Sequence, residues 1–367
     1  MRSLRALRDL LVIVAITLVL LEVALRIYNP LYVPLRADKI ELPVNRVFKL
    51  VNLNNRKVDR ELVNTYNAIG LRGPAYPGDP DNYVKIFTVG GSTTACVTLT
   101  DGKTWPDILG RKLQATAARS VWLNNAGING HSTFGHLVLL ENHLKNYKPD
   151  FIVFLIGIND VGRSDLNDFD RRLTVAGLSW RNRLVANSEL LSTMQVLNRT
   201  RRAFDGGINY DVDHDLTKYA NLTETSQSRQ AHLKQHGEDV RRAYRRRVEA
   251  LVERTRAVGA TPVLVTQPAL FGYGIDPTTE RELGALEYVP GGPSAGLQWE
   301  TLELYNNVTR SVALDKTVVL IDAARQMPKD SRLYFDWTHY SNDGAAVMAE
   351  IVYEGLHKHI EAGRSRR

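Results

Sequence analysis

The stretch Val84-Lys85-Ile86-Phe87-Thr88-Val89-Gly90-Gly91-Ser92-Thr93-Thr94 decides the fold. It is a run of β-branched and aromatic residues that ends in two glycines and a hydroxyl residue. Such a run predicts a buried strand that stops abruptly, and the glycines allow a sharp turn because they have no Cβ. Ser92 would then lie just past the carboxyl end of a central strand, where open α/β sheets bind ligands. Gly-Gly-Ser is also common in ordinary loops, so the rest of the chain has to support this interpretation.

The same pattern, a short apolar segment followed by a polar loop with glycine, recurs further along the chain. Residues 121–126 precede Gly-Ile-Asn-Gly at 127–130, and residues 151–156 precede Gly-Ile-Asn-Asp at 157–160. Further strands are predicted at 262–266 and 318–321. Amphipathic helical segments lie between the strands, most clearly at 238–258. This alternation predicts a three-layer α/β/α fold around a flavodoxin-like parallel sheet of order 2-1-3-4-5, with its site where strands one and three are neighbours.

Length and composition predict one main domain with appendages. A chain of 367 residues with 44% hydrophobic content can bury the core of one domain of roughly 250–300 residues. We expect the boundaries to fall as follows: a cytoplasmic tip and transmembrane signal anchor at 1–28, a stalk or wrapping segment at 29–82, the main domain at 83–360 and a basic tail at 361–367. An insertion at about 162–237 is too long for a simple loop, so we expect it to fold locally or to act as a lid.

The amino terminus resembles a membrane signal. An apolar run at 10–21 continues through 23–27 after Glu22, and three arginines precede it: Arg2, Arg5 and Arg8. The shorter run suits a signal-peptide core, whereas the longer one approaches the length of a spanning helix. No small-x-small cleavage site follows, and Arg26 with Tyr28 is typical of an interfacial anchor. We therefore expect an uncleaved signal anchor, and a cleaved signal peptide or a buried helix remain the alternatives.

Charge and cysteine content exclude some classes of protein. The chain has a net charge of +7 and a single cysteine, Cys96, which excludes an internal disulfide and any multi-cysteine metal site. The aromatic and basic residues do not interleave as in a nucleic-acid module. We interpret the basic surface, including the arginines at 241–247, as solvated because acids are interspersed in the same helix. An anionic envelope polymer or a lipid head group remains an alternative partner.

A final motif, Asp336-Trp337-Thr338-His339, precedes the last helix. Taken in chain order with Ser92, Asn-Ala-Gly-Ile-Asn-Gly at 125–130 and Gly-Ile-Asn-Asp at 157–160, it resembles the four blocks of the SGNH (GDSL-like) hydrolase superfamily. The resemblance covers about 84–359, and the four blocks are far more specific together than singly.

The resemblance implies a role for each matching residue: Ser92 as nucleophile and backbone oxyanion donor, Gly130 as backbone oxyanion donor, Asn159 as side-chain oxyanion donor, His339 as base and Asp336 as its orienting acid. It implies neither a metal nor a cofactor. Gly91 departs from the family pattern, which usually has Asp there. That Asp is not the triad acid, so the departure concerns the geometry of the loop more than the chemistry.

The whole layout is similar to that of membrane-anchored bacterial members. It combines the anchor with Leu-Arg-Gly-Pro at 71–74 and Tyr-Phe-Asp-Trp-Thr-His at 334–339. The resemblance implies a single-pass protein of the bacterial inner membrane, with a periplasmic serine esterase or O-acyl transferase that acts on O-acylated cell-envelope glycans. A lipid or lysophospholipid esterase is one alternative, and a catalytically silent envelope scaffold or binding module is another. The acyl group, the physiological substrate, protein partners and the oligomeric state remain open.

Overall fold

The computed structural model describes residues 2–29, 35–36, 39–53, 55–163, 180–205 and 214–362. The chain forms two compact units. One comprises Met1–Leu42 with Arg171–Asn209, and the other comprises Pro43–Asp170 with Tyr210–Arg367.

The larger unit is built on a parallel sheet of five strands in the order β6-β5-β7-β8-β9. In chain order the strands are β5 (Tyr83–Gly90), β6 (Ser120–Asn125), β7 (Phe151–Ile156), β8 (Thr261–Thr266) and β9 (Val319–Ile321). This is the predicted order 2-1-3-4-5, and the predicted fold class is confirmed. All of β7 is buried, as its unbroken apolar sequence predicts for a strand covered on both faces.

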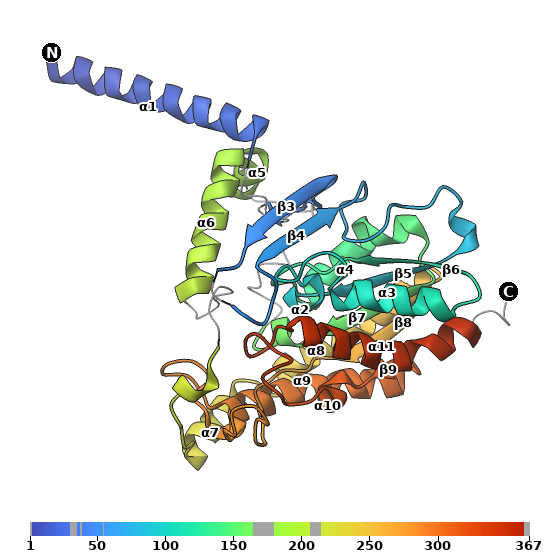
Figure 1. Ribbon diagram of the computed structural model, residues 1–367. Helices are drawn as coiled ribbons and strands as arrows, with labels where there is room; N and C mark the ends of the chain where they lie inside the picture. Colours follow the sequence, from blue (N-terminus) through green and yellow to red (C-terminus); the bar gives the residue numbers. More distant parts are fainter. Residues whose placement is uncertain are drawn as a thin grey trace. The chain divides into compact units, whose positions relative to one another are not determined.

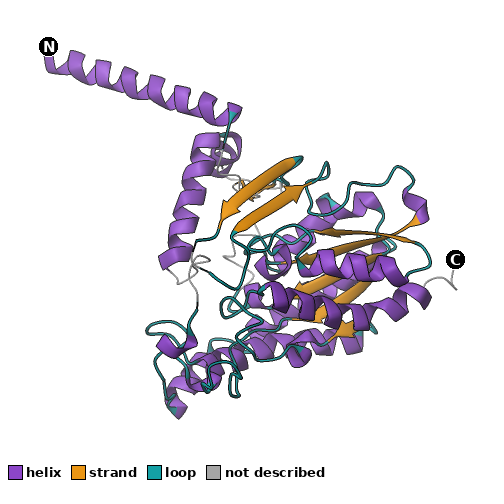
Figure 2. Ribbon diagram, in the orientation of Figure 1, coloured by secondary structure: helices purple, strands orange, loops and turns teal. Residues whose placement is uncertain are grey.

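Helices cover both faces of the sheet, which Figure 2 shows as a layer of strands between helical layers. On one side α3 (Trp105–Thr116) packs against α11 (Asn342–Ala362). On the other side α8 (Glu238–Ala257) packs against the two helices α4 (Thr133–Asn142) and α9 (Ala295–Asp315). The short helices of this unit are α2 (Ser92–Ala95), α7 (Ser226–Lys234) and α10 (Ala323–Gln326).

Side-chain caps fix where the helices begin. Thr104 accepts a hydrogen bond from the backbone N–H of Asp107 at the start of α3. The Ser294 hydroxyl accepts from Leu297 N–H at the start of α9. These caps satisfy N–H groups that have no acceptor within the helix.

Residues 43–82 belong to the same compact unit as the sheet. They form an antiparallel hairpin of β3 (Arg46–Val51) and β4 (Glu61–Tyr66). Leu62 and Leu71 are buried, whereas almost all of β3 is exposed. The expected stalk or wrapping role of the whole segment 29–82 stays a prediction.

The smaller unit contains α1 (Arg2–Ile27), the strand pair β1 (Leu35–Arg36) and β2 (Lys39–Ile40), α5 (Trp180–Asn187) and α6 (Glu189–Asp205). Within α1, residues Leu4–Ile27 are long and apolar enough to cross a membrane, with a mean hydropathy of 2.7 and none of the most apolar window buried. The choice among an uncleaved anchor, a cleaved signal peptide and a buried amino-terminal helix stays a prediction.

Part of the predicted insertion at about 162–237 lies outside the described residues, namely 164–179 and 206–213. Its described part folds locally into α5, α6 and α7. Most of the predicted basic tail, at 363–367, also lies outside the described residues.

Candidate active site

Ser92, His339 and Asp336 form one connected chain of polar contacts. Ser92 Oγ lies 2.7 Å from His339 Nε2, and His339 Nδ1 lies 2.6 Å from Asp336 Oδ2. Ser92 is the first residue of α2 just after β5, and the other two residues lie in the loop that enters α11. The fold thus brings together residues that are 247 positions apart in the sequence.

The loop of Asp336 and His339 is held by its own backbone. Asp336 Oδ1 accepts from the N–H groups of Thr338 and His339, each at 2.7 Å, so that Oδ2 is left to face the imidazole. The Phe335 ring stacks on that imidazole with the ring centres 5.5 Å apart. These contacts fix the orientation of the His339 ring before any ligand binds.

The charge state of Asp336 follows from competing effects. Burial by itself would raise the pKa of this carboxyl group. The charge of His339 and the hydrogen bonds from His339 and Thr338 more than offset burial, so the pKa lies below its ordinary value. Asp336 is therefore an ionised acceptor at neutral pH.

The predicted oxyanion residues Gly130 and Asn159 lie in two loops that are tied together. Asn159 Nδ2 donates to the His131 carbonyl at 3.0 Å, and Ile128 N–H donates to Gly90 O, also at 3.0 Å. Gly130 itself has a φ of +73°, a conformation that glycine adopts without steric cost. The loops after β6 and β7 are thus anchored to each other and to the end of β5.

Gly91 explains how Asn159 can lie so close to the serine turn. A Cβ at position 91 would come within 2.0 Å of Asn159 Nδ2, far inside van der Waals contact. Any side chain there, including the Asp usual in the resembled family, would require this amide to move. The amide of Asn159 thus occupies space that is open because residue 91 is a glycine instead of the usual Asp.

A buried ion pair, which the sequence reasoning missed, links the same two loops. Asp160 accepts from the backbone N–H and the hydroxyl of Thr133, and Arg247 Nε donates to that hydroxyl at 2.8 Å. Arg247 and Asp160 are both buried, and the guanidinium lies over the Phe134 ring. The interpretation of 241–247 as a solvated face is wrong for Arg247. Its position three residues after the core residue Tyr244 was the sequence signal for an inward-facing side chain.

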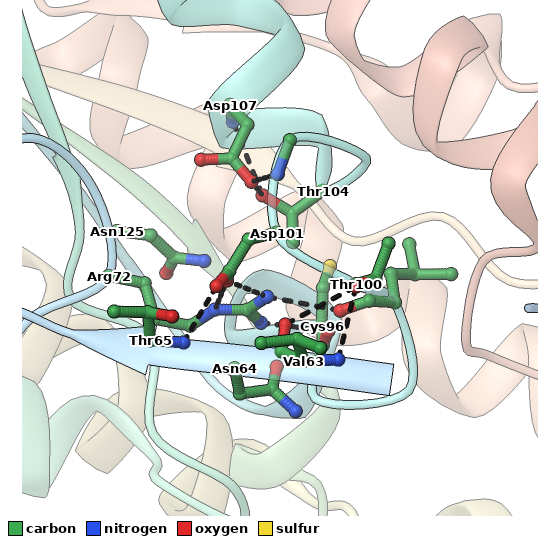
Figure 3. Close-up of polar contacts among 12 residues, drawn as sticks. Val63, Asn64, Thr65, Arg72, Cys96, Thr100, Asp101, Thr104, Asp107 and Asn125 are labelled. Carbon is green, nitrogen blue, oxygen red and sulfur yellow. Dashed lines mark hydrogen bonds and ion pairs between the residues drawn. The ribbon is translucent and has the colours of Figure 1, made fainter. Parts of the chain in front are cut away.

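Arg72, from the Leu-Arg-Gly-Pro segment, holds the other end of the serine helix (Figure 3). Its guanidinium is buried and donates to the carbonyls of Ala95, Cys96 and Leu99, at 2.8, 3.0 and 3.0 Å, and to Asp101. Cys96 has a φ of +48°, so α2 ends after four residues and leaves carbonyls that need donors. From the sequence, this segment served only as part of the resemblance, and the burial of Arg72 was not predicted.

Lys329, a half-buried side chain, supports the loop after β8. Its Nζ donates to the carbonyls of Ala269 and Phe271 and lies 3.4 Å from the centre of the Trp299 ring. Leu270, between those two carbonyls, donates its N–H to Trp337 O, next to Asp336. Burial lowers the pKa of Lys329 to about 7, although Glu303 acts in the opposite direction.

No group of three or more His, Cys, Asp or Glu side chains among the described residues could hold a metal ion. The thiol of Cys96 is buried, and burial raises its pKa to about 12. The absence of a metal or cofactor from the mechanism stays a prediction.

The larger unit is thus an α/β fold whose parallel sheet brings Ser92, His339 and Asp336 into contact at its carboxyl edge. Residues 88–347 match the model of the GDSL-like Lipase/Acylhydrolase family. The chain belongs to this family, and this membership makes it an esterase or acylhydrolase. No curated protein matches the chain.

Solved structures resemble the chain at low identity. An α/β hydrolase from the metagenome of Lake Arreo is 17% identical, with a TM-score of 0.42, and the match covers 74% of this chain and 94% of that one. An acetylxylan esterase from Geobacillus stearothermophilus is 16% identical, with a TM-score of 0.42 and coverage of 75% and 93%. A G-D-S-L family protein from Desulfitobacterium hafniense is 12% identical, with a TM-score of 0.41 and coverage of 74% and 99%.

We predict that Arg72→Met lowers both stability and turnover. The buried carbonyls at the end of α2 lose their donors, and each unsatisfied group costs about 1–3 kcal/mol. Denaturant unfolding and ester turnover, measured where circular dichroism shows a folded variant, test this. Arg72→Lys keeps the charge without the guanidinium fork and should recover only part of the loss. Wild-type unfolding and turnover in Arg72→Met would contradict the assignment.

We predict that Lys329 gives a pH-dependent component of stability. Its pKa is about 7 in the fold and about 10.4 when unfolded, so the unfolded chain binds more protons between these values. The burial penalty is present in full below pH 7 and is relieved as pH rises toward about 10. The free energy of unfolding of wild type minus Lys329→Met should therefore rise with pH, by up to about 1.4 kcal/mol per unit.

Denaturant titrations at pH 7, 8, 9 and 10 measure this difference. Lys358→Met removes an exposed charge and serves as the control. A difference for Lys329→Met that stays constant over this range, or falls, would contradict the prediction.

Proposed function

We propose that this chain is an extracytoplasmic serine esterase or O-acyl transferase that works through Ser92, His339 and Asp336. The observation that carries the proposal is the continuous contact from Ser92 Oγ through the His339 imidazole to the Asp336 carboxylate. A serine hydroxyl is a poor nucleophile unless a neighbouring base removes its proton. The ionised Asp336 keeps the proton of the imidazole on Nδ1 and leaves Nε2 as that base.

In the first half-reaction, Ser92 Oγ attacks the ester carbonyl carbon while its proton passes to His339 Nε2. The tetrahedral intermediate carries its negative charge on the former carbonyl oxygen. His339 then gives the proton to the departing alcohol oxygen as the carbon–oxygen bond breaks, which leaves an acyl group on Ser92.

The donors for the oxyanion would be the Ser92 N–H, the Gly130 N–H and the Asn159 amide. Ser92 begins α2, so its N–H has no acceptor within the helix. The bond from Asn159 to the His131 carbonyl fixes the amide in advance, which supports electrostatic stabilisation without reorganisation during the reaction.

In the second half-reaction, an acceptor hydroxyl loses its proton to His339 Nε2 and attacks the carbonyl carbon of the acyl-enzyme. The bond from this carbon to Ser92 Oγ then breaks, and His339 returns the proton to Ser92 Oγ. Water gives hydrolysis, and a sugar hydroxyl gives transfer. The candidate anchor in α1, with arginines before it, supports action at the outer side of the inner membrane. The basic chain and this location motivate an O-acylated envelope glycan as substrate, and a lipid ester is the second candidate.

We predict that Ser92→Ala and His339→Ala each lower kcat/KM by about 10⁴–10⁶-fold. The test uses the full chain in detergent, with aryl esters from acetyl to long-chain acyl. Ser120→Ala, at an exposed serine, is the matched control and should keep full activity. A folded parent no more active than Ser92→Ala on any ester would favour the scaffold alternative.

The same assay distinguishes the acceptor and the substrate class. Acyl release that rises with added glycan would indicate transfer, and a maximum of activity at long acyl chains would indicate lipid esters.

We predict that Gly91→Ala lowers kcat by about 10²–10³-fold, the usual effect of losing one oxyanion donor. The added Cβ would displace Asn159 Nδ2, which lies 2.0 Å from its position. The double variant with Asn159→Ala should be little worse than either single variant, because both remove the same donor. Gly110→Ala is the control, since its Cβ meets Leu123 Cβ at an ordinary 3.5 Å. Wild-type kcat in both Gly91→Ala and Asn159→Ala would exclude Asn159 as a donor.

A further inference from the structure

Helix α6 is built the opposite way from a water-soluble surface helix. Its exposed face carries Leu191, Met194 and Leu197, whose side chains are 39%, 58% and 52% exposed. Its inward face carries the hydroxyl residues Ser192 and Thr193, which are only 5% and 8% exposed. A soluble helix turns its apolar stripe inward and its polar face outward.

The inward hydroxyls of α6 make hydrogen bonds within their own unit. Ser192 Oγ donates to Val185 O in α5 at 2.7 Å, and Thr193 Oγ1 accepts from Asn29 Nδ2 at 3.0 Å. The polar face is therefore committed to packing, and the orientation of α6 about its own axis is fixed. With α6 in this orientation, its apolar side chains face outward.

Helix α5, which packs against α6, also carries exposed apolar side chains. Trp180 is 67% exposed and Leu184 is 54% exposed. The Arg181 guanidinium lies 5.4 Å from the centre of the Trp180 ring. An exposed tryptophan beside a cation is typical of the membrane–water interface, where the indole lies at the level of the head groups.

Glu22 of α1 attaches this pair of helices to the candidate span. One carboxylate oxygen accepts from Ser188 Oγ at 2.8 Å and Leu190 N–H at 3.0 Å, and the other accepts from Glu189 N–H at 3.1 Å. Glu22 thus caps the first turn of α6. Arg26 adds a bond to Asn187 O at 2.7 Å, so that the α5–α6 junction is fixed to the last turns of α1.

This attachment sets the depth of α6 relative to the span. Glu22 lies inside Leu4–Ile27, about 7.5 Å before its end at the α-helical rise. Within the unit, α6 runs across the direction of α1 rather than beside it (Figure 1). If α1 crosses a bilayer, α6 therefore begins at the depth of the interface and runs along it.

We propose that α5 and α6 form a second membrane contact, with Trp180, Leu184, Leu191, Met194 and Leu197 inserted among the lipids at the interface. Interfacial helices of this kind bury their apolar face about 5–10 Å into the boundary between head groups and acyl chains. This range agrees with the depth that Glu22 imposes. The bilayer is the occupant because Glu22 and Arg26 attach these helices to the end of a helix that itself needs lipid cover. The inference rests on the membrane anchor of the proposed function.

The test places a fluorescent label at single introduced cysteines in the full chain. The chain is reconstituted in vesicles of phosphatidylcholine and phosphatidylglycerol. Met194→Cys and Leu197→Cys report on the face, Val14→Cys reports on the span, and Leu314→Cys, at an 81% exposed leucine of the larger unit, is the control. The native Cys96 is buried, and the unsubstituted chain gives its background. Quenchers are lipids with a spin label near the head group or deep in the acyl chain, and aqueous iodide.

We expect the labels at 194 and 197 to be quenched by the shallow lipid more than by the deep one and to be protected from iodide. The label at 14 should be quenched most by the deep lipid, and the label at 314 by iodide alone. Quenching of 194 and 197 by iodide alone would overturn the inference, and so would protection from both iodide and lipid, since protein would then cover the face. Lipid quenching at 314 would overturn it too, by showing that any exposed label partitions into lipid.

The label at 14 and ester turnover separate this inference from the proposed function. If 14 is in lipid and esters turn over while 194 and 197 are in water, only the second membrane contact fails. If 14 itself is in water, the anchor fails, whatever the activity of the site.

Discussion

The parallel pairing of β5 with β7 is the constraint on which the candidate site depends. Their register sets Gly90 opposite Leu155, so that both strands end at the same level and their loops leave the sheet side by side. The turn of Ser92 follows one strand, and the turn of Asn159 follows the other. Because both strands are buried and rich in β-branched residues, a slip of register would expose their side chains or bury loop polar groups. The core of the domain thereby fixes the distance between the two loops.

Buried and half-buried charged side chains then hold these loops through hydrogen bonds. Arg72 holds the carbonyls at the end of α2, Arg247 with Asp160 joins the start of α4 to the turn after β7, and Lys329 holds the loop beside Asp336. Each group is taken out of water at a cost that its hydrogen bonds must offset. In return, these hydrogen bonds hold the loops in one conformation without a ligand. A preorganised site depends on such loops.

The strands and the loops that follow them could be predicted from the sequence, but the charged side chains that hold those loops could not. Apolar runs such as 151–156 identify a strand because every residue in them is buried, and residues after the strands converge by topology alone. The contacts of Ser92 with His339 were therefore open to prediction from four short motifs. Arg72 and Lys329 were not, because the burial of a charged side chain depends on carbonyl groups that only the folded loops bring together. Arg247 was an intermediate case, since its helical position faces the core but its charge suggested solvent.

Gly91, which stands where the family usually has Asp, leaves space into which the Asn159 amide packs. At this position a side chain and the Asn159 amide compete for one volume, since the Cβ and the amide nitrogen would lie 2.0 Å apart. In this chain, a side chain at position 91 would require the amide to shift. Here the amide occupies the space itself and is held by the His131 carbonyl. Loss of the Asp is therefore no sign of a decayed site, because the space it would have filled is used by the residue expected to stabilise the oxyanion.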